Sequence, residues 1–562
     1  MTVHPADIDD VAVPLDALLV DAAFGPLRRL TPDLSAAKLV GRLAARPGAT
    51  AERLRALAAE LARVALGTSQ LEPAPRDRRF ADPAWKQSPL LHRILQAYLA
   101  SDRTVDELIA AGGLGWRDDQ RVRFLADNLL AALSPSNVPV LNPASAKAAI
   151  DSSGLNFVRG ALNLVRDMTR APRVPQMVDE SGFTVGENLA ATPGAVVLRT
   201  EVFELIQYAP QTPTVRQVPM LLVPPTINKF YVLDLAPGRS WIEHLVRSGQ
   251  QVFVLSWRNP DARHAGWGLD TYLRAILDAL DAVERICRTE RTVLTGACSG
   301  GILASLVAAH LAATGRSERL AGLAFAVTVL DYRRAGVAAA LADRHLAAAA
   351  TAISRRRGYL DGRLLAEVFA WLRPDDLVWQ YWVNNYLLGR KPPAFDVLFW
   401  NADTTRMSAR LHADFVDMAL HNRLPEPNGL TALGVPVDLG GVDVDTYVIA
   451  GIADHITPWQ SCYRTTQLLG GDTRFVLSTS GHIAAIVNPP GNAKATYRVN
   501  STNPADPQKW LQGAATEQGS WWPDFVEWLG QRCGSAKKAP KRLGGAGLTP
   551  LIEAPGTYVL DS

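Results

Sequence analysis

Leu294-Thr295-Gly296-Ala297-Cys298-Ser299-Gly300-Gly301 is the stretch that decides the fold of this 562-residue chain. An apolar run precedes it and an Ala-rich run of helical character follows it, which predicts a strand, a tight turn and a helix. The turn has the G-x-S-x-G spacing of a nucleophile elbow, with Cys298 in the place of the serine. The positive end of the following helix favours the thiolate of this cysteine. A buried structural cysteine in a Gly-rich turn is the alternative, and the motif alone does not decide between the two.

The composition narrows the possible classes of protein. A net charge of +3, with basic residues mostly dispersed, gives no argument for binding nucleic acid. Four cysteines without metal-ligand spacing do not make a disulfide framework, and they favour a reducing, cytoplasmic setting. The acidic N-terminus lacks the basic region of a signal peptide, and no apolar stretch is long enough to span a bilayer. We therefore expect no transmembrane segment, and only peripheral association with any lipid-like phase.

Three regions follow from the patterns along the chain. Residues 1–190 carry apolar positions at helical spacing and predict a helical N-terminal domain. Residues 191–534 alternate strand and helix patterns, which predicts a parallel, doubly wound α/β sheet. Within them, residues 331–435 interrupt the alternation and are rich in Trp and Tyr, as expected of a cap over the nucleophile. Residues 535–562, rich in Gly, Pro, Lys and Ala, are expected to be a poorly ordered tail.

Two later strand patterns each end in a side chain that can complete a catalytic triad. Residues 446–450 lead into a loop with Asp454, and residues 475–478 lead to His482. The order nucleophile, acid, histidine is that of the α/β-hydrolase fold, which we therefore predict. His482 would take the proton of Cys298, and Asp454 would hold the imidazole in the needed tautomer. His455 is the competing base, ranked second because Asp454 and its immediate neighbour cannot easily direct both side chains to one ring.

The predicted oxyanion hole uses two backbone N–H groups. Ser299 supplies one, and the loop after residues 220–224 supplies the other, near Thr226, Ile227 and Asn228. The two prolines before Thr226 have no N–H to donate. A cysteine nucleophile suits a thioester substrate, because transfer from coenzyme A to Cys298 exchanges one thioester for another with little change in free energy.

Several motifs together resemble those of the polyhydroxyalkanoate synthases, from about residue 66 to residue 558. The motifs are Pro224-Pro-Thr-Ile-Asn-Lys-Phe-Tyr231, Ser256-Trp-Arg-Asn-Pro260, Gly296-Ala-Cys298-Ser-Gly-Gly301, Asp454-His-Ile-Thr-Pro-Trp459, and Gly481-His-Ile483 with Asn488-Pro-Pro-Gly491. Three more look like the medium-chain, single-subunit class II group: Asn384-Asn-Tyr-Leu-Leu-Gly389, Phe399-Trp-Asn-Ala-Asp-Thr-Thr-Arg406 and Lys538-Ala-Pro-Lys-Arg-Leu543.

The resemblance implies that the protein polymerises (R)-3-hydroxyacyl-CoA into a storage polyester and releases CoA. It implies that Cys298 carries the chain, with Asp454 and His482 as its partners. It also implies a homodimer on the surface of cytoplasmic polyester granules, and a reaction without a metal or prosthetic group, the CoA thioester being the substrate.

The sequence departs from the class II pattern in its first sixty or so residues and at two positions near the predicted site. Thr328 stands where class II enzymes usually have Ser, and Ala484 stands where they usually have Gln. Both look like the short-chain class I pattern. Thr328, Ala484 and Ser480 are our candidate substrate-binding positions. They predict that the enzyme uses medium-chain substrates and also accepts short-chain ones.

Two rival functions remain. An acyl-CoA thioesterase or polyester depolymerase on the same fold would pass the acyl group to water. The rival from another class is a non-catalytic granule-coat protein, which would have short amphipathic repeats and no complete triad.

Overall fold

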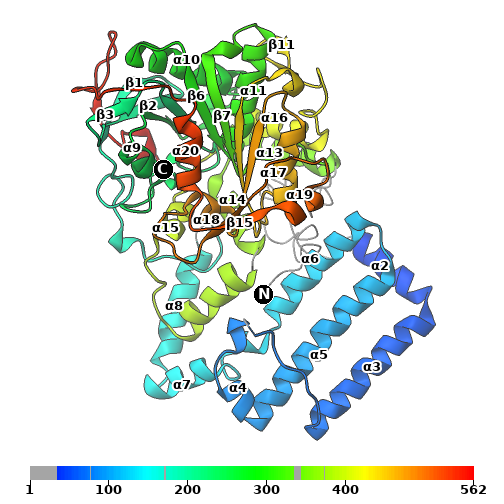
Figure 1. Ribbon diagram of the computed structural model, residues 1–562. Helices are drawn as coiled ribbons and strands as arrows, with labels where there is room; N and C mark the ends of the chain where they lie inside the picture. The colour runs from blue at the N-terminus through cyan, green and yellow to red at the C-terminus, as the bar shows by residue number, and fades with distance from the viewer. Residues whose placement is uncertain (1–33, 76, 170–171, 334–343, 373) are drawn as a thin grey trace. The chain divides into compact units, whose positions relative to one another are not determined.

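The computed structural model describes residues 34–75, 77–169, 172–333, 344–372 and 374–562 (Figure 1). These form two compact units. The first contains the described residues up to Asp179 together with Arg363–Phe395, and the second contains Glu180–Gly362 and Asp396–Ser562.

The described part of the first unit is helical, as the apolar spacing of the N-terminal region predicts, and residues 1–33 of that predicted domain lie outside the described residues. Its longest helix, α5 (Pro89–Gly112), begins where the Ser88 hydroxyl accepts the N–H of Leu91 and ends at Gly113 in the left-handed conformation. Both are standard helix-end signals. The other helices of this region are α2 (Leu34–Ala44), α3 (Pro47–Leu66), α4 (Ala84–Gln87), α6 (Trp116–Ala132), α7 (Pro143–Asp151) and α8 (Leu155–Met168).

The second unit is built on an eleven-stranded sheet of order β15-β14-β13-β12-β7-β6-β4-β5-β2-β1-β17. Its six central strands, from β13 to β5, run parallel, and the strands on either side pair antiparallel. The strands are β1 (Gly194–Arg199), β2 (Phe203–Tyr208), β4 (Met220–Val223), β5 (Val252–Trp257), β6 (Thr292–Ala297), β7 (Leu320–Ala326), β12 (Thr446–Gly451), β13 (Thr473–Ser478), β14 (Thr496–Val499), β15 (Ala515–Gln518) and β17 (Ile552–Glu553).

Helices flank this sheet, among them α10, α11 and α20 in Figure 1. The helices of the unit are α9 (Trp241–Arg247), α10 (Leu269–Cys287), α11 (Ser299–Ala313), α13 (Arg344–Arg357), α15 (Asp396–Ala402), α16 (Ala409–Leu420), α17 (Trp459–Tyr463), α18 (His482–Ile486), α19 (Pro507–Gly513) and α20 (Trp522–Gly530). The central strands β4 and β6 are buried throughout, as expected for parallel strands covered on both faces. The α/β-hydrolase prediction is confirmed in its strand order and in its parallel core.

The predicted cap, residues 331–435, does not form one body. Residues 334–343 lie outside the described residues, and Arg363–Phe395 belongs to the first unit rather than to the sheet unit. There α14 (Gly362–Leu372) is followed by two π-helical segments, Asp375–Trp379 and Trp382–Leu387.

The Tyr386 hydroxyl anchors this segment within the first unit by donating to Asp167 at 2.9 Å. A Cβ on Gly160 of α8 would lie 1.9 Å from the carbonyl oxygen of Tyr386. Such close packing explains why the segment belongs with the N-terminal helices. Aromatic composition predicted an insertion here, but it carries no information about the surface on which the insertion packs.

The prediction of a poorly ordered tail for residues 535–562 is wrong. β16 (Ala536–Lys538) pairs antiparallel with β3 (Thr214–Arg216), and β17 adds to the edge of the main sheet beside β1. Two smaller pairs complete the sheets: β8 (Tyr359–Leu360) with β9 (Met407–Ser408), and β10 (Thr431–Ala432) with β11 (Val435–Pro436). A composition rich in Gly, Pro and Lys suggested a tail because it does not reveal partners that lie over 300 residues away.

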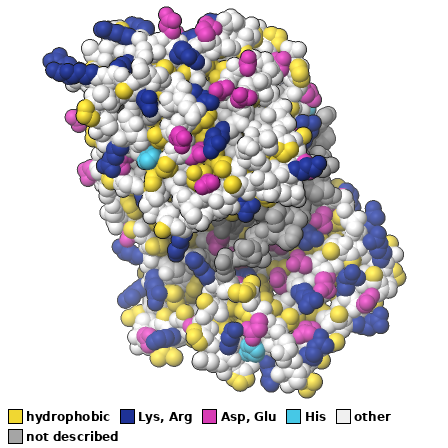
Figure 2. Space-filling view, in the orientation of Figure 1, with side chains coloured by type: hydrophobic (Ala, Val, Ile, Leu, Met, Phe, Trp, Pro, Cys, Tyr) yellow, Lys and Arg dark blue, Asp and Glu magenta, His cyan; other side chains and the backbone are white. Residues whose placement is uncertain are grey.

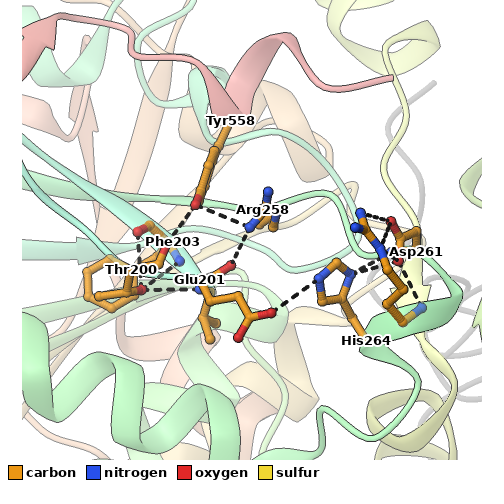
Figure 3. A network of polar contacts seen from close by, with 9 residues as sticks. Thr200, Glu201, Phe203, Arg258, Asp261, His264 and Tyr558 are labelled. Carbon is orange, nitrogen blue, oxygen red and sulfur yellow. Dashed lines mark hydrogen bonds and ion pairs between the residues drawn. The ribbon is translucent and has the colours of Figure 1, made fainter.

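A buried carboxylate holds the last residues in place. Glu204 of β2 is fully buried, and its carboxylate accepts the N–H groups of Thr557 and Tyr558 at 2.9 and 3.0 Å. Figure 3 shows Tyr558 above the start of β2, where its hydroxyl donates to the carbonyl oxygen of Thr200 at 2.6 Å and accepts from Arg258 at 3.4 Å. The C-terminal residues are thus fixed to the sheet by hydrogen bonds to a charged group.

Figure 2 shows Lys and Arg side chains interspersed with Asp and Glu over the face seen, in keeping with the small net charge. Within the described part of the chain, no helix is long and apolar enough to cross a membrane.

Candidate active site

The turn after β6 has the geometry of a nucleophile elbow. Cys298 follows the last residue of β6 and has φ 50° and ψ −121°, and α11 begins at the next residue. Its N–H donates to the carbonyl oxygen of Ala326 in β7 at 2.9 Å. A positive φ is strained for a residue with a side chain, and such strain persists where the surrounding structure imposes it.

The glycines on either side of Cys298 are required by close packing. A Cβ on Gly300 would lie 2.3 Å from the carbonyl oxygen of Val223, and one on Gly296 would lie 2.5 Å from the Cα of Gly301. The elbow therefore packs against the end of β4 and against its own helix, as the spacing of the motif predicts.

The structure brings together Cys298, Asp454 and His482, three residues from three separate strand ends. The Nδ1 atom of His482 lies 2.7 Å from Oδ2 of Asp454, and the Cys298 side chain lies close enough to raise the pKa of this imidazole. The three side chains are nearly excluded from solvent, since Cys298 is 5% exposed, Asp454 1% and His482 8%. The predicted triad is therefore a real spatial cluster in the sheet unit.

The electrostatics of this cluster favour an ionised acid beside a protonated base. Burial by itself would lower the pKa of His482, but the Asp454 carboxylate and the Cys298 side chain outweigh it and raise that pKa to about 10. Burial would raise the pKa of Asp454, yet the charge and hydrogen bond of His482, together with the hydrogen bonds from the Thr457 hydroxyl and N–H, hold that pKa below its usual value. The pair is thus poised to accept and hold a proton.

Asp454 is held by the loop that follows it. Its Oδ1 accepts the N–H groups of Ile456 and Thr457 at 2.8 and 2.9 Å, and the Thr457 hydroxyl donates to Oδ2 at 2.5 Å. The sequence placed Thr457 in the acid motif but gave no sign that its side chain takes part. Only the folded loop shows that this hydroxyl reaches the carboxylate.

A small cavity of about 10 Å³ lies beside the nucleophile. We call it the recess; its walls are Cys298, Ile302, Val327, Val329, Tyr332, Ile456 and Thr457. Most of these walls are apolar. Val327 has φ 45°, an unusual value for a β-branched residue. The chain turns at this residue, and β7 therefore ends at Ala326. The apolar run of residues 323–330 predicts a strand that continues to residue 330, and its residue types carry no signal for a turn at Val327.

The predicted oxyanion loop lies next to the elbow. The N–H of Thr226 donates to the hydroxyl of Ser299 at 3.0 Å, so this N–H is already engaged. Asn228 uses its side-chain oxygen to accept the N–H of Lys229 at 3.3 Å. Among the three loop positions, Ile227 and Asn228 therefore stay as the predicted donors, together with the N–H of Ser299 at the start of α11.

The predicted substrate-binding positions are not among the walls of the recess. Thr328 is fully buried behind the elbow, where its hydroxyl donates to the carbonyl oxygens of Cys298 and Ala326 at 3.3 and 3.0 Å. Ala484 is exposed on α18, and Ser480 accepts from Ser478 at 3.3 Å. His455 is half-buried, and the imidazole bonded to Oδ2 of Asp454 is that of His482.

The other three cysteines are also buried, and the thiols of Cys287 and Cys462 donate to Gln251 and to the carbonyl oxygen of Thr457. Burial raises the pKa of Cys287 and of Cys533 to about 12, and it raises that of Cys462 well above the ordinary value. A second pairing of histidine and acid, His264 with Asp261 in Figure 3, forms the cap of a short helical turn. The elbow position therefore distinguishes Cys298 from the rest.

Comparison with known proteins agrees with this architecture. A family model described as "Poly-beta-hydroxybutyrate polymerase (PhaC) N-terminus" matches residues 76–245, and one described as "alpha/beta hydrolase fold" matches residues 219–489. The chain is 47% identical over 511 residues to Poly(3-hydroxyalkanoate) polymerase 2 of Ectopseudomonas oleovorans, covering 91% of each chain.

The chain belongs to the poly(3-hydroxyalkanoate) polymerase family. It is also 44% identical to polymerase 1 of the same organism, over 94% of each chain. Its identity to the polymerase subunit PhaC of Cupriavidus necator is 40%, over 88% of this chain and 85% of that one. The polymerase is thus an enzyme of the acyltransferase class, and its elbow carries a cysteine where a hydrolase of the same fold commonly has a serine.

Proposed function

We propose that this enzyme polymerises (R)-3-hydroxyacyl groups from their CoA thioesters into a polyester, with release of CoA and with Cys298 as the covalent carrier. The observation that carries the proposal is the cluster of Cys298 at the elbow with His482 and Asp454, in which Nδ1 of His482 lies 2.7 Å from Asp454 Oδ2, in a member of the polymerase family.

In the first step, the sulfur of Cys298 attacks the thioester carbonyl carbon of the substrate. Because Nδ1 of His482 is bonded to Asp454, Nε2 is the nitrogen that receives the thiol proton, and the transfer gives the imidazolium that the raised pKa of His482 favours. The N–H groups of Ser299 and of the loop at Ile227 and Asn228 stabilise the negative oxygen of the intermediate. As the intermediate collapses, the bond to the CoA sulfur breaks, and CoA leaves with the proton held by His482.

In the second step, the hydroxyl of another 3-hydroxyacyl-CoA attacks the acyl group on Cys298. His482 takes the hydroxyl proton, an ester bond forms, and the bond to the Cys298 sulfur breaks, returning the proton to the thiol. The chain is then longer by one unit and is a CoA thioester, which acylates Cys298 again and releases that CoA. Thiol, imidazole and carboxylate supply every group these steps require, so we propose a reaction without a metal or prosthetic group.

We propose medium-chain substrates with acceptance of short chains. The recess beside Cys298 supports an apolar site for the start of the acyl side chain, because Val327, Val329 and Ile456 line it. A cavity of about 10 Å³ holds one water-sized group, so longer side chains require its walls to move. Thr328 would influence length indirectly, through the position of the elbow.

We also propose that the enzyme works as a homodimer at the surface of cytoplasmic polyester granules. Helix α8 supports a surface role because it exposes an apolar stripe at helical spacing, formed by Leu155, Val158, Leu162 and Val165. The test is co-sedimentation with purified polyester: replacing these four residues by Ser or Gln should release the enzyme while leaving CoA release from soluble substrate intact. Light scattering of the purified enzyme tests the dimer.

One assay tests the central proposal. Purified enzyme with (R)-3-hydroxyacyl-CoA should give insoluble polymer and free CoA, whereas a thioesterase would give free hydroxy acid. Cys298→Ala should abolish CoA release, and Cys287→Ala, which removes a buried thiol elsewhere, should retain it. Free acid as the main product, or polymer from Cys298→Ala, would refute the proposal.

A further inference from the structure

We propose that Thr457 is a positioning residue of this active site: its hydroxyl fixes the Asp454 carboxylate in the orientation that directs His482 at Cys298. This inference rests on the proposed roles of Cys298, Asp454 and His482. It adds to them a side chain to which neither the motif nor the family names assign a part.

Three polar atoms form a closed triangle. Thr457 Oγ1 lies 2.5 Å from Asp454 Oδ2 and 3.1 Å from His482 Nδ1, and the last two atoms are 2.7 Å apart. An ionised carboxylate only accepts, so both the hydroxyl and the Nδ1–H donate to Oδ2. The lone pairs of Oγ1 are then left facing Nδ1–H. The imidazolium formed during catalysis has two oxygens beside it rather than one.

The backbone of the same loop holds the other half of the carboxylate. Oδ1 of Asp454 accepts from the N–H groups of Ile456 and Thr457 at 2.8 and 2.9 Å. With Oδ1 held by the main chain, the Thr457 hydroxyl is the side-chain group that prevents Oδ2 from turning away from His482. Charge-assisted hydrogen bonds of this kind are the stronger ones.

Burial makes the hydroxyl hard to replace. Thr457 is 4% exposed and lines the recess, and its carbonyl oxygen accepts from the Cys462 thiol at 3.7 Å. The recess beside the hydroxyl is mostly apolar, so a water there would find few polar partners, and loss of the hydroxyl leaves Oδ2 underbonded. The carboxylate can then relax away from the imidazole, and the imidazolium loses stabilisation.

The chain offers a well matched control. Thr446, at the start of β12, is fully buried, and its hydroxyl donates to the backbone carbonyl oxygen of Val444 at 2.9 Å. Thr446→Val therefore removes a buried hydroxyl from the strand that leads to Asp454 without touching the triad. Thr457→Val removes the hydroxyl at nearly constant volume, and Thr457→Ser retains it.

The experiment measures kcat and KM for CoA release, together with the pH dependence of alkylation of Cys298 by iodoacetamide. We expect Thr457→Val to lower kcat by about 10–100-fold with little change in KM, as other groups that orient a catalytic ligand do. The alkylation midpoint should move to higher pH, because a less stabilised imidazolium supports the thiolate less well. Thr457→Ser should restore kcat to within about 3-fold of wild type, since it keeps the hydrogen bond.

Two outcomes would reduce Thr457 to a structural role and overturn the inference. The first is an equal loss of kcat in Thr446→Val and Thr457→Val. The second is an unshifted alkylation midpoint in Thr457→Val, with Thr457→Ser as impaired in kcat as Thr457→Val. If Cys298→Ala still releases CoA, the proposed function itself fails, whatever Thr457→Val does. If Cys298→Ala is inactive and Thr457→Val has wild-type kcat, only the positioning role is lost.

Discussion

Gly301 lies against Thr328 so closely that a Cβ on Gly301 would be 2.0 Å from the Thr328 hydroxyl oxygen. That hydroxyl also donates to the carbonyl oxygen of Cys298 at 3.3 Å. Thr328 therefore packs against the start of α11 and is hydrogen-bonded to the elbow. The size of the side chain at position 328 thus determines how closely α11 can pack against the end of β7. This relationship explains how a residue outside the recess can still influence the reaction.

We expect Gly301→Ala to destabilise the protein by about 1–3 kcal/mol and to lower CoA release sharply, because the added methyl overpacks the back of the elbow. Thr328→Ala should partly rescue it, since it removes the two side-chain atoms nearest to the new methyl. Thermal unfolding and CoA release of the two single variants and the double variant test this. Strictly additive effects would show that the two residues are not coupled.

We expect Asp454→Asn to slow chain elongation more than acylation of Cys298. The variant loses the charge that stabilises the His482 imidazolium and favours the wrong tautomer, which costs about 10⁴-fold in comparable triads. Acylation depends less on the base, because a thiol ionises more readily than a hydroxyl. Radiolabelled substrate should leave acyl-enzyme without long polymer. A variant in which both steps slow equally would contradict this division.

The His482–Asp454 pair should stabilise the fold in a pH-dependent way. Its folded-state pKa of about 10 exceeds the ordinary value of 6.5, so protonated His482 contributes its full stabilisation below pH 6.5. That contribution falls as pH rises and is lost above about pH 10. Asp454, whose pKa is lowered, contributes above its ordinary value of 3.8 and loses the contribution as the pH falls further.

Chemical denaturation of wild type and His482→Gln at pH 6 and pH 9 measures this effect. The difference in unfolding free energy between the two proteins should be larger at pH 6 than at pH 9. A difference that stays constant, or grows at pH 9, would show that the imidazole is neutral in the folded state.

The sequence predicted the parts of this fold that local pattern controls. The elbow, the strands leading to Asp454 and His482, and the helical N-terminal region all show in apolar spacing and in turn residues. Their chain order then suffices to place Cys298, Asp454 and His482 together, because the carboxyl ends of parallel strands meet at one edge of a sheet.

The features that the sequence did not predict depend on partners distant along the chain. Thr457 looks like an ordinary loop residue until the loop folds and its hydroxyl reaches Asp454. The positive φ of Val327 ends β7 early, although residues 323–330 have a continuous strand pattern. Glu204, an acid within an apolar strand, gave no hint that it binds Thr557 more than 350 residues later.

Removal of residues 555–562 should destabilise the sheet unit by about 3–5 kcal/mol, because the buried Glu204 carboxylate loses three of its hydrogen bonds. Arg199 remains as its ion-pair partner. Glu204→Gln should recover part of the loss in the truncated chain, since a neutral amide costs less to bury, yet destabilise the full-length chain. Denaturant unfolding of the four proteins tests this. Truncation without loss of stability would contradict the anchoring role.

The side chains that line the recess should influence the length of the substrate that the enzyme incorporates. Val329 lines the recess, so Val329→Ala enlarges the space beside Cys298 without adding a polar group. Each methylene in such a pocket contributes about 1–3 kcal/mol to discrimination, so the ratio of C10 to C4 incorporation should rise by about 10-fold or more. The measurement is the monomer composition of polymer made from equal C4 and C10 substrates.

Two comparison variants separate the recess from the positions suggested by the sequence. Ile302→Ala enlarges another wall of the recess and should shift the composition in the same direction as Val329→Ala. Ala484→Gln changes an exposed position on α18 and removes no apolar contact beside Cys298. If the recess selects the length of the acyl side chain, this variant should leave the ratio of C10 to C4 monomers within about 2-fold of wild type. A larger shift from Ala484→Gln than from Val329→Ala would mean that the acyl chain passes over α18. The sequence interpretation of Ala484 would then hold, and the recess would not be the site that selects the substrate.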